Sequence, residues 1–197
     1  IMIRSNTISM NTSVRKTGKS DKKIIKYTLD NLSASFSASQ IRSSDITYKQ
    51  KWSEVYTGKI DYSLSFGRDN FIKPLSLLEN VPLIGKQFSD FQIFYTPSNF
   101  KTGMTLNEKL NWNKTRSDVK SPDTYNFGLS RNLNFDYKLT NNIATKYSWT
   151  GQSRLNEFRG YIWTAVRDFD PGVVTQTTES FSSTYSPSII KWLKPSF

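Results

Sequence analysis

Hydrophobic and polar residues alternate along most of this chain, and the alternation is clearest between Ile46 and Phe66. Even-numbered positions in this stretch carry mainly aromatic and aliphatic residues, whereas odd-numbered positions carry mainly lysine, serine, threonine and aspartate. A period of two residues is typical of a β-strand with one apolar face and one polar face. The pattern therefore predicts a long strand whose two faces meet different surroundings.

The length of this stretch indicates what the apolar face contacts. At about 3.3 Å per residue the stretch would extend roughly 70 Å, whereas an ordinary globular strand has about five or six residues. A tilted membrane strand needs about 9–11 residues. Residues from Tyr56 to Phe66 supply that length, with aromatic side chains at both ends as in an interfacial girdle. We therefore expect a strand that crosses a membrane and continues beyond it, as in a tall barrel.

In a membrane barrel one face of each strand contacts lipid and the other faces the lumen. The apolar positions that we expect to face lipid, in this stretch and in two later strands, are Tyr56, Ile60, Tyr62, Leu64, Phe66, Leu133, Phe135, Tyr147 and Trp149. The polar positions that we expect to line the lumen are Lys49, Lys51, Lys59 and Asp61. No stretch has the roughly 18 consecutive apolar residues of a membrane helix, so strands are the expected spanning elements.

The same alternation divides the rest of the chain into strands and irregular parts. Further strands are expected at Ile3–Val14, Ile25–Ala38 (with a bulge near Asp30), Phe88–Thr96, Phe100–Thr115, Tyr125–Leu139, Ile143–Thr150 and Val173–Tyr185. Residues 1–66 and 88–186 are thus predicted to be barrel strands, with a longer insert near 151–172. Residues 67–87 form an apolar inter-strand insert, and 187–197 a connector leaving the last strand. The predicted fold class is all-β, with antiparallel transmembrane β-barrel strands.

Two of the expected strands carry a charge on the face assigned to lipid, namely Glu108 and Arg131. An arginine at the bilayer midplane costs about 2–4 kcal/mol, and a glutamate somewhat less. If the two strands form a hairpin across the turn-rich stretch 116–123, a register with Trp112 opposite Phe127 sets Glu108 opposite Arg131. The two charges would then form a cross-strand ion pair.

The lengths of the connections predict an orientation of the barrel. Thr140–Asn142 is expected to be a tight turn that pairs Phe135 with Tyr147. This turn and Thr96–Asn99 are short, whereas 116–123 is longer. Outer-membrane barrels have short periplasmic turns and longer outer loops, so the short turns are assigned to the periplasm.

Composition excludes several kinds of active site. The chain contains no histidine and no cysteine, which removes the usual general base, the commonest metal ligand and any thiolate or disulfide. We therefore expect no enzyme activity, no catalytic residue, no cofactor and no metal. The net charge of +11 raises nucleic-acid binding as an alternative. Because the cations mostly alternate singly along strands, a lysine-rich lumen and loops near anionic lipid are favoured, without a nucleic-acid partner.

Two segments that do not alternate carry a family resemblance. Phe71–Phe100, which reads FIKPLSLLENVPLIGKQFSDFQIFYTPSNF, resembles a stretch of the SprA/Sov family, and the tail Ser186–Phe197, SPSIIKWLKPSF, is also similar to it. Members of this family form the outer-membrane translocon of the type IX secretion system of Bacteroidetes, which also supports gliding motility. The resemblance covers only these segments and is consistent with the strands around them.

The resemblance implies a function and partners beyond what periodicity predicts. It implies one very large outer-membrane barrel with a wide pore, of which this chain is one part. Secreted proteins would cross the pore in the folded state and pass through a lateral opening to a PorV-type barrel. A periplasmic plug protein would close the channel. The family brings no catalytic residues, and since Ile3–Val14 already alternates we expect an internal part of the protein.

Three other interpretations remain open. A TonB-dependent receptor or a porin would have a plug domain or a constriction loop, and strands closer to the bilayer thickness. A soluble β-sandwich or carbohydrate-binding module would bury the alternating face against a second sheet. Trp52 and Trp112 would then be core residues or a sugar platform. An enzyme is the least favoured interpretation.

Overall fold

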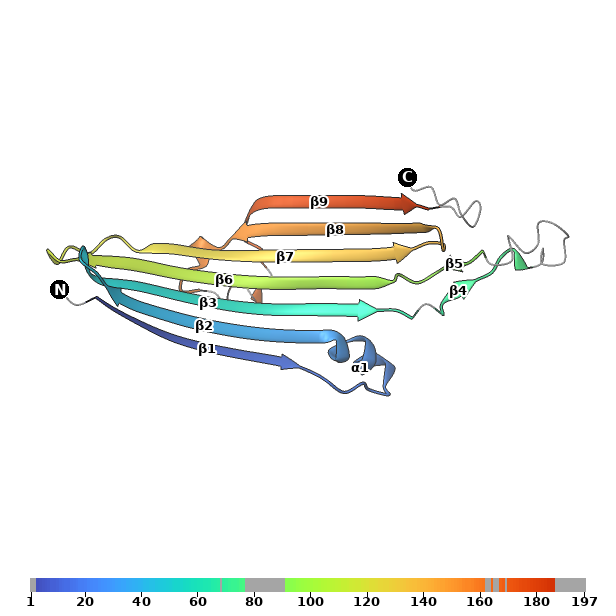
Figure 1. Cartoon of the computed structure of the whole chain (residues 1–197), viewed down its shortest axis with the longest axis horizontal. Helices are drawn as coiled ribbons and strands as arrows, with labels where there is room; N and C mark the ends of the chain where they lie inside the picture. The colour runs from blue at the N-terminus through green and yellow to red at the C-terminus, as the bar shows by residue number, and fades with distance from the viewer. Residues whose placement is uncertain are drawn as a thin grey trace. The chain divides into compact units, whose positions relative to one another are not determined.

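The computed structural model is a sheet protein built from long strands. It describes residues 3–67, 69–76, 91–161, 164, 167–168 and 170–186. The main sheet contains seven strands in the order β1-β2-β3-β6-β7-β8-β9, which Figure 1 draws side by side, and a second sheet pairs β4 with β5. The pairs β1–β2, β2–β3 and β4–β5 are antiparallel. The predicted all-β class with antiparallel strands is confirmed, and β1 and β9 are the two edges of the main sheet.

Most of the strands lie close to their predicted positions. Their bounds are β1 Arg4–Arg15, β2 Leu32–Ser44, β3 Tyr48–Ser65, β4 Phe71–Ile72, β5 Ile93–Phe94, β6 Asn99–Thr115, β7 Thr124–Lys138, β8 Ile143–Arg154 and β9 Val173–Tyr185. The strand expected at Phe88–Thr96 is represented among the described residues only by the short β5. β3 and β6 are the longest, with 18 and 17 residues.

β1, β2 and β3 form a meander in which partners keep the same parity. Met10 lies opposite Ala38, which in turn lies opposite Tyr56. The turn between β2 and β3 is closed by Asp45, whose Oδ1 accepts the backbone N–H of Tyr48 at 2.7 Å. Aspartate favours such turns because its side chain bonds the backbone a few residues ahead. Even-numbered residues of all three strands therefore share one face, and odd-numbered residues share the other.

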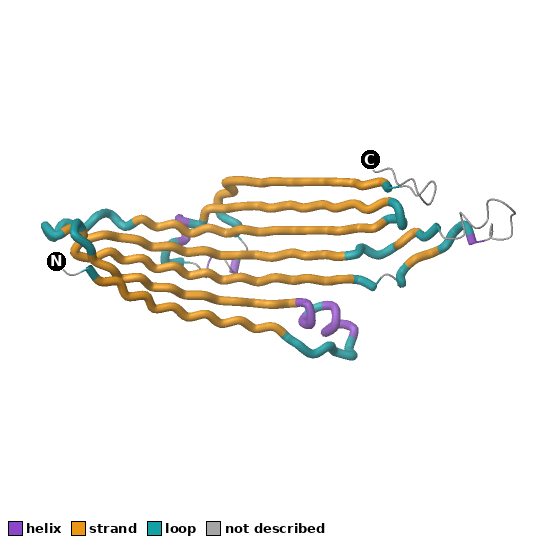
Figure 2. Tube along the Cα trace, in the orientation of Figure 1, coloured by secondary structure: helices purple, strands orange, loops and turns teal. Residues whose placement is uncertain are grey.

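The connection between β1 and β2 corrects the predicted strand beginning at Ile25. A helix α1 (Lys23–Tyr27) and a 3₁₀ turn η1 (Leu29–Asn31) precede β2, and Figure 2 draws them as helical coils beside the strands. Thr28 Oγ1 donates to a backbone carbonyl at 2.6 Å and Asn31 Nδ2 donates to another at 2.7 Å. Such local side-chain bonds compete with strand pairing, so the strand begins only after η1.

The turn between β6 and β7 is tighter than predicted. The backbone N–H of Ser121 donates to the carbonyl of Asn113 at 2.8 Å. Asp118 lies in the turn with φ of 63°, a left-handed conformation that aspartate tolerates. Pairing therefore begins close to the turn, and the predicted register with Trp112 opposite Phe127 is wrong.

The chain forms two compact units, and several strands contribute to both. The first unit comprises Ile1–Tyr62, Gly103–Arg131 and Thr150–Thr177, and the second comprises Ser63–Thr102, Asn132–Trp149 and Thr178–Phe197. The buried apolar residues of the first unit are Phe127, Leu129 and Leu155. In the second unit Phe94 is buried and meets the ring of Phe71 at a centroid distance of 5.8 Å. Each unit thus has its own small apolar cluster.

The predicted insert and connector are only partly described. Residues 67 and 69–76 of the insert contain β4 and a turn in which Ser76 N–H donates to the Lys73 carbonyl at 3.2 Å. Residues 77–87 and the connector 187–197 lie outside the described residues. No helix within the described ranges is long and apolar enough to cross a membrane.

Candidate functional surfaces

The first unit has an exposed apolar face on β1, β2 and β3. On β1, Ile8 and Val14 are 61% and 71% exposed. Phe36 of β2 is also exposed, and its partner on β3 is Gly58. Ile60, one of the residues predicted to face lipid, lies on this face and is 45% exposed. A contiguous apolar surface of this kind marks contact with a membrane, a ligand or another protein.

The opposite face of the same strands is lined by hydroxyl groups. β2 contributes the serines at positions 33, 35, 37 and 39, and their β3 partners are Asp61, Lys59, Thr57 and Val55. On β1 the partners of these serines are Arg15, Ser13, Asn11 and Ser9. Two of the residues predicted to line a lumen, Lys59 and Asp61, therefore belong to a predominantly polar surface in the structure.

The lysines predicted to line the lumen all lie beside carboxylates. Lys59 Nζ is 2.9 Å from Asp61 Oδ2 on the same strand. Lys51 forms an ion pair with Asp45 of the β2–β3 turn, and the pKa of Asp45 is lowered mainly by this hydrogen bond. These groups therefore add little net charge to the polar face. Exposed pairs of this kind stabilise a fold only slightly.

Two turns of the first unit are tied together by charged side chains. Arg116 Nη2, in the β6–β7 turn, donates to the backbone carbonyl of Asp45 at 2.6 Å. Asp118 accepts Lys49 Nζ at 2.8 Å and Lys114 Nζ at 3.0 Å. These hydrogen bonds lower the pKa of Asp118 to about 2, and the one from Lys49 has the largest effect. The predicted lumen residue Lys49 thus contributes to a network between turns.

The apolar face of the first unit is hollowed at Gly58. The hollow has a volume of about 320 Å³. Its apolar lining residues are Val14, Ala34, Phe36, Ile60, Met104 and Leu106. A Cβ atom added at Gly58 would meet no other atom within 4 Å. The missing side chain of this glycine therefore leaves an open space among apolar neighbours.

Over β7, the segment that follows β8 covers part of the apolar surface of the first unit. Leu155 is buried with Phe127 and Leu129, and its backbone N–H donates to the Phe127 carbonyl at 2.7 Å. The two ends of the segment meet, because a Cβ atom at Gly172 would lie 2.5 Å from the carbonyl oxygen of Arg154. The insert predicted near 151–172 therefore begins only after Arg154, where β8 ends, and its two ends lie close together. The half-buried residues that pack on this cluster are Leu106, Tyr125 and Phe158.

The other residues predicted to face lipid lie in two groups. Tyr62 belongs to the first unit, whereas Leu64, Phe66, Leu133, Phe135, Tyr147 and Trp149 belong to the second, and all seven are half-buried. The ring of Phe135 lies 6.2 Å from that of Tyr137. The hydrogen bond from Leu155 to Phe127 has the register predicted for β7 and β8, in which Phe135 is opposite Tyr147. Their contact with lipid stays a prediction.

The structure gives Glu108 and Arg131 separate hydrogen-bond partners. Glu108 Oε1 accepts the hydroxyl of Tyr125 at 3.0 Å, and Arg131 Nη2 donates to Ser153 Oγ at 3.2 Å. The ion pair between the two charges was predicted from a β6–β7 register that the turn contradicts. Tyr125, which lies close to the turn, occupies the position near Glu108 that the register assigned to Arg131.

Sequence reasoning missed a four-membered stack on the apolar face. The rings of Trp52 and Trp112 are stacked, with centroids 5.7 Å apart and an interplanar angle of 11°. Arg42 Cζ lies 3.8 Å from the centroid of Trp52, and Lys120 Nζ lies 5.0 Å from that of Trp112. Arg42, Trp52 and Trp112 come from β2, β3 and β6, and Lys120 lies in the connection between β6 and β7. Only the register of the strands brings them together.

The described residues contain no group of three or more acidic, histidine or cysteine side chains that could hold a metal ion. The structure defines the class of the protein as all-β, built on an antiparallel sheet with an apolar and a hydroxyl-lined face. Comparison with known proteins adds no family, because no protein-family model matches the chain and no curated protein is significantly similar to it.

Proposed function

We propose that this chain is a wall segment of an outer-membrane channel that exports folded proteins, as in type IX secretion and gliding motility. The observation that carries the proposal is the exposed apolar face of β1–β3, which lies back to back with a hydroxyl-lined face. Such a sheet is stable when an apolar medium lies on one side and water on the other. A membrane barrel provides both, and its closure satisfies the backbone hydrogen bonds.

A soluble β-sandwich is the main alternative, and the exposure of the apolar face argues against it. A sandwich would bury that face against a second sheet about 10 Å away. Among the described residues the second sheet consists only of β4 and β5, with two residues each, and these lie in the other compact unit. It is too small to cover the long strands.

Strand length favours a tall barrel over an ordinary porin or TonB-dependent receptor. β3 and β6 contain 18 and 17 residues, whereas a tilted strand crosses a bilayer with about 9–11. The extra length would project beyond the membrane. A wall of this height suits a channel that guides a folded protein.

The two edges of the sheet support a larger barrel. Every residue of β1 and of β9 is exposed, and neither strand contains proline or lysine. Soluble proteins protect sheet edges with prolines, lysines or bulges because an open edge pairs with other chains. We propose that further strands of the same barrel pair with both edges.

The resemblance to the SprA/Sov family supports secretion rather than another barrel function. It rests on residues 71–100 and 186–197. The partners proposed on this basis are a PorV-type barrel, a periplasmic plug protein, the secreted substrates and the lipid of the outer membrane. The hydroxyl-lined face would then border the aqueous path of the substrate.

Cysteine accessibility in intact cells tests the membrane barrel. The chain has no cysteine of its own, so single cysteines can be added to the full-length protein at neighbouring positions on opposite faces. Lys59→Cys should react with a water-soluble maleimide, whereas Ile60→Cys should be protected by lipid. Ser35→Cys and Ala34→Cys, their partners on β2, should repeat this contrast. Equal labelling of both faces by the water-soluble reagent would exclude the barrel.

Export is tested separately by crosslinking. A short bifunctional crosslinker attached at Lys59→Cys should trap secreted proteins in transit, and the same reagent at Ile60→Cys should not. Labelling of Ser117→Cys from outside or inside the cell would show on which side the β6–β7 turn lies. A barrel whose lumen positions never capture a secreted protein would be a different kind of channel.

A further inference from the structure

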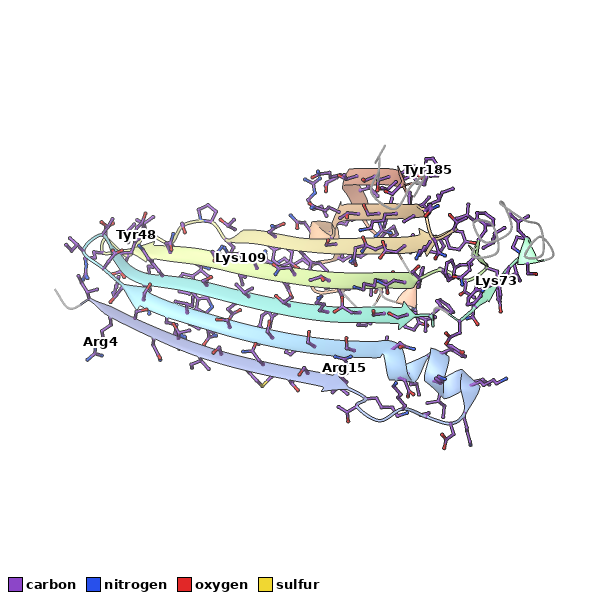
Figure 3. The ribbon with its side chains drawn as sticks, turned by 45° about the vertical axis from the view of Figure 1, so that its right-hand side comes forward. Arg4, Arg15, Tyr48, Lys73, Lys109 and Tyr185 are labelled. Carbon is purple, nitrogen blue, oxygen red and sulfur yellow. The ribbon has the colours of Figure 1, made fainter. Side chains whose placement is uncertain are left out.

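Cations and tryptophans form a row across the apolar face of the first unit, close to the β2–β3 and β6–β7 turns. Its members are Arg4 on β1, Arg42 on β2, Trp52 on β3, Trp112 on β6, and Lys120. Arg42 lies opposite Trp52 on one side and opposite Asn6 on the other. Arg4 precedes Asn6 by two residues on the same face, and Figure 3 labels it near the start of β1.

The row presents cationic N–H groups and no free aromatic ring face. Trp52 and Trp112 cover one face of each other, and Arg42 and Lys120 cover the two outer faces. A sugar would therefore find no ring on which to stack. Arg4 and Arg42 are exposed, and within the described ranges no carboxylate lies within 4.0 Å of either guanidinium. Guanidinium groups bind phosphate oxygens in a bidentate manner.

The neighbouring carboxylates leave an excess of cations in this row. Lys120 pairs with Asp123 at 3.0 Å, and Arg159 shares the same carboxylate at 3.5 Å. Glu54 and Glu108 lie on the same face, farther from the turns, and both accept hydrogen bonds from neutral donors, at 2.7 Å and 3.0 Å. Arg4 and Arg42 are therefore available to an anion from outside.

The row and the hollow at Gly58 are separated by a distance that suits a lipid. Trp52 and Gly58 lie about 20 Å apart along β3, at about 3.3 Å per residue. With a strand tilt of about 45°, this corresponds to a depth of about 14 Å, within the roughly 20–22 Å that separate the headgroup surface from the middle of a bilayer. A headgroup at the level of Trp52 would thus place its acyl chain along the strand as far as the hollow.

We infer that Arg4 and Arg42 bind the phosphate of a membrane lipid whose acyl chain occupies the hollow at Gly58. The inference rests on the proposed function, since it requires this face to lie in a membrane. A nucleic acid or a soluble phosphate would use the cations but not the apolar hollow farther along the same strands. The lipid is the ligand that accounts for both features.

The full-length protein, delipidated in detergent and titrated with phospholipid under native mass spectrometry, tests the inference. The wild type should bind phosphatidylglycerol more tightly than phosphatidylcholine. The double variant Arg4→Gln/Arg42→Gln should weaken phosphatidylglycerol binding by about tenfold or more, as expected for loss of charged hydrogen bonds. Lys109→Gln removes one positive charge from an exposed position on the other face of β6 and should leave binding unchanged.

Several results would overturn the inference. Equal affinity of the double variant and the wild type for phosphatidylglycerol would show that the two arginines do not bind the lipid phosphate. Displacement of the lipid by millimolar inorganic phosphate would assign the row to a soluble anion. The failure of the inference is distinct from failure of the barrel, because lipid protection of Ile60→Cys is measured independently. The double variant is compared at equal membrane levels, and Arg42→Lys, which keeps the charge, should retain part of the preference.

Discussion

The substitution Ile60→Arg distinguishes lipid from water outside the apolar face. Ile60 lies near the middle of the stretch predicted to cross the membrane, and nearly half of its side chain is exposed in the structure. If lipid surrounds it, an arginine near the bilayer midplane costs about 2–4 kcal/mol. This corresponds to about a 30- to 1,000-fold loss in the folding equilibrium. If water surrounds it, the change should stay within about 0.5 kcal/mol, as for other surface substitutions.

Two matched arginine substitutions calibrate the measurement. Tyr56→Arg, near the end of the spanning stretch, should cost only about 0–1 kcal/mol in a membrane. Ser63→Arg, at an exposed position on the opposite face of β3, should be close to neutral. The assay is a urea titration of the full-length protein in lipid vesicles, with folding followed by electrophoretic mobility. Equal midpoints for Ile60→Arg and Ser63→Arg would refute the assignment of the faces.

Two further predictions concern loops and turns. Gly172→Ala should loosen the insert after β8 and speed hydrogen exchange in residues 155–161, because φ is +68° and a Cβ atom would lie 2.5 Å from the Arg154 carbonyl. Gly160→Ala, where φ is +82° but space is open, should have a smaller effect, and equal effects would contradict the close approach. The pKa of Asp118 is lowered from 3.8 to about 2, so its ion pairs stabilise the β6–β7 turn fully above pH 3.8 and are lost below pH 2. Protection of this turn from hydrogen exchange should therefore fall as the pH drops between these two values. Asp118→Asn, which tolerates the same backbone conformation, should remove this dependence, and an unchanged profile would show that the carboxylate is not responsible.

The strands themselves were largely predictable from the sequence. In β3 the alternation runs along most of the strand and predicts both the strand and its faces. The strand expected at Val173–Tyr185 has the bounds of β9. The segment before β2 was not predictable in this way. Its apolar residues also suit a strand, but local side-chain bonds of Thr28 and Asn31 hold it in helical turns.

The arrangement of charges was less predictable because it depends on register. A turn-rich stretch from 116 to 123 allows several registers, and the left-handed conformation of Asp118 selects a tight one. In this register the Tyr125 hydroxyl, rather than Arg131, lies within hydrogen-bond distance of Glu108. The connection between the two strands, residues 116–123, is still longer than residues 139–142 between β7 and β8, and the orientation inferred from loop lengths stays a prediction. The stack of Trp52 and Trp112 likewise follows from pairing between strands and has no signal in either strand alone.

The hydroxyl-lined face of β1–β3 has a consequence for movement along it. Each serine hydroxyl both donates and accepts hydrogen bonds, so this wall holds water without preferring either sign of charge. The lysines beside it, such as Lys59, lie close to carboxylates. In the proposed channel, a protein sliding past would exchange one loosely held water layer for another and find few points of strong attachment. Friction along such a wall would depend little on the cargo's own charge, which suits a passage shared by many different sequences.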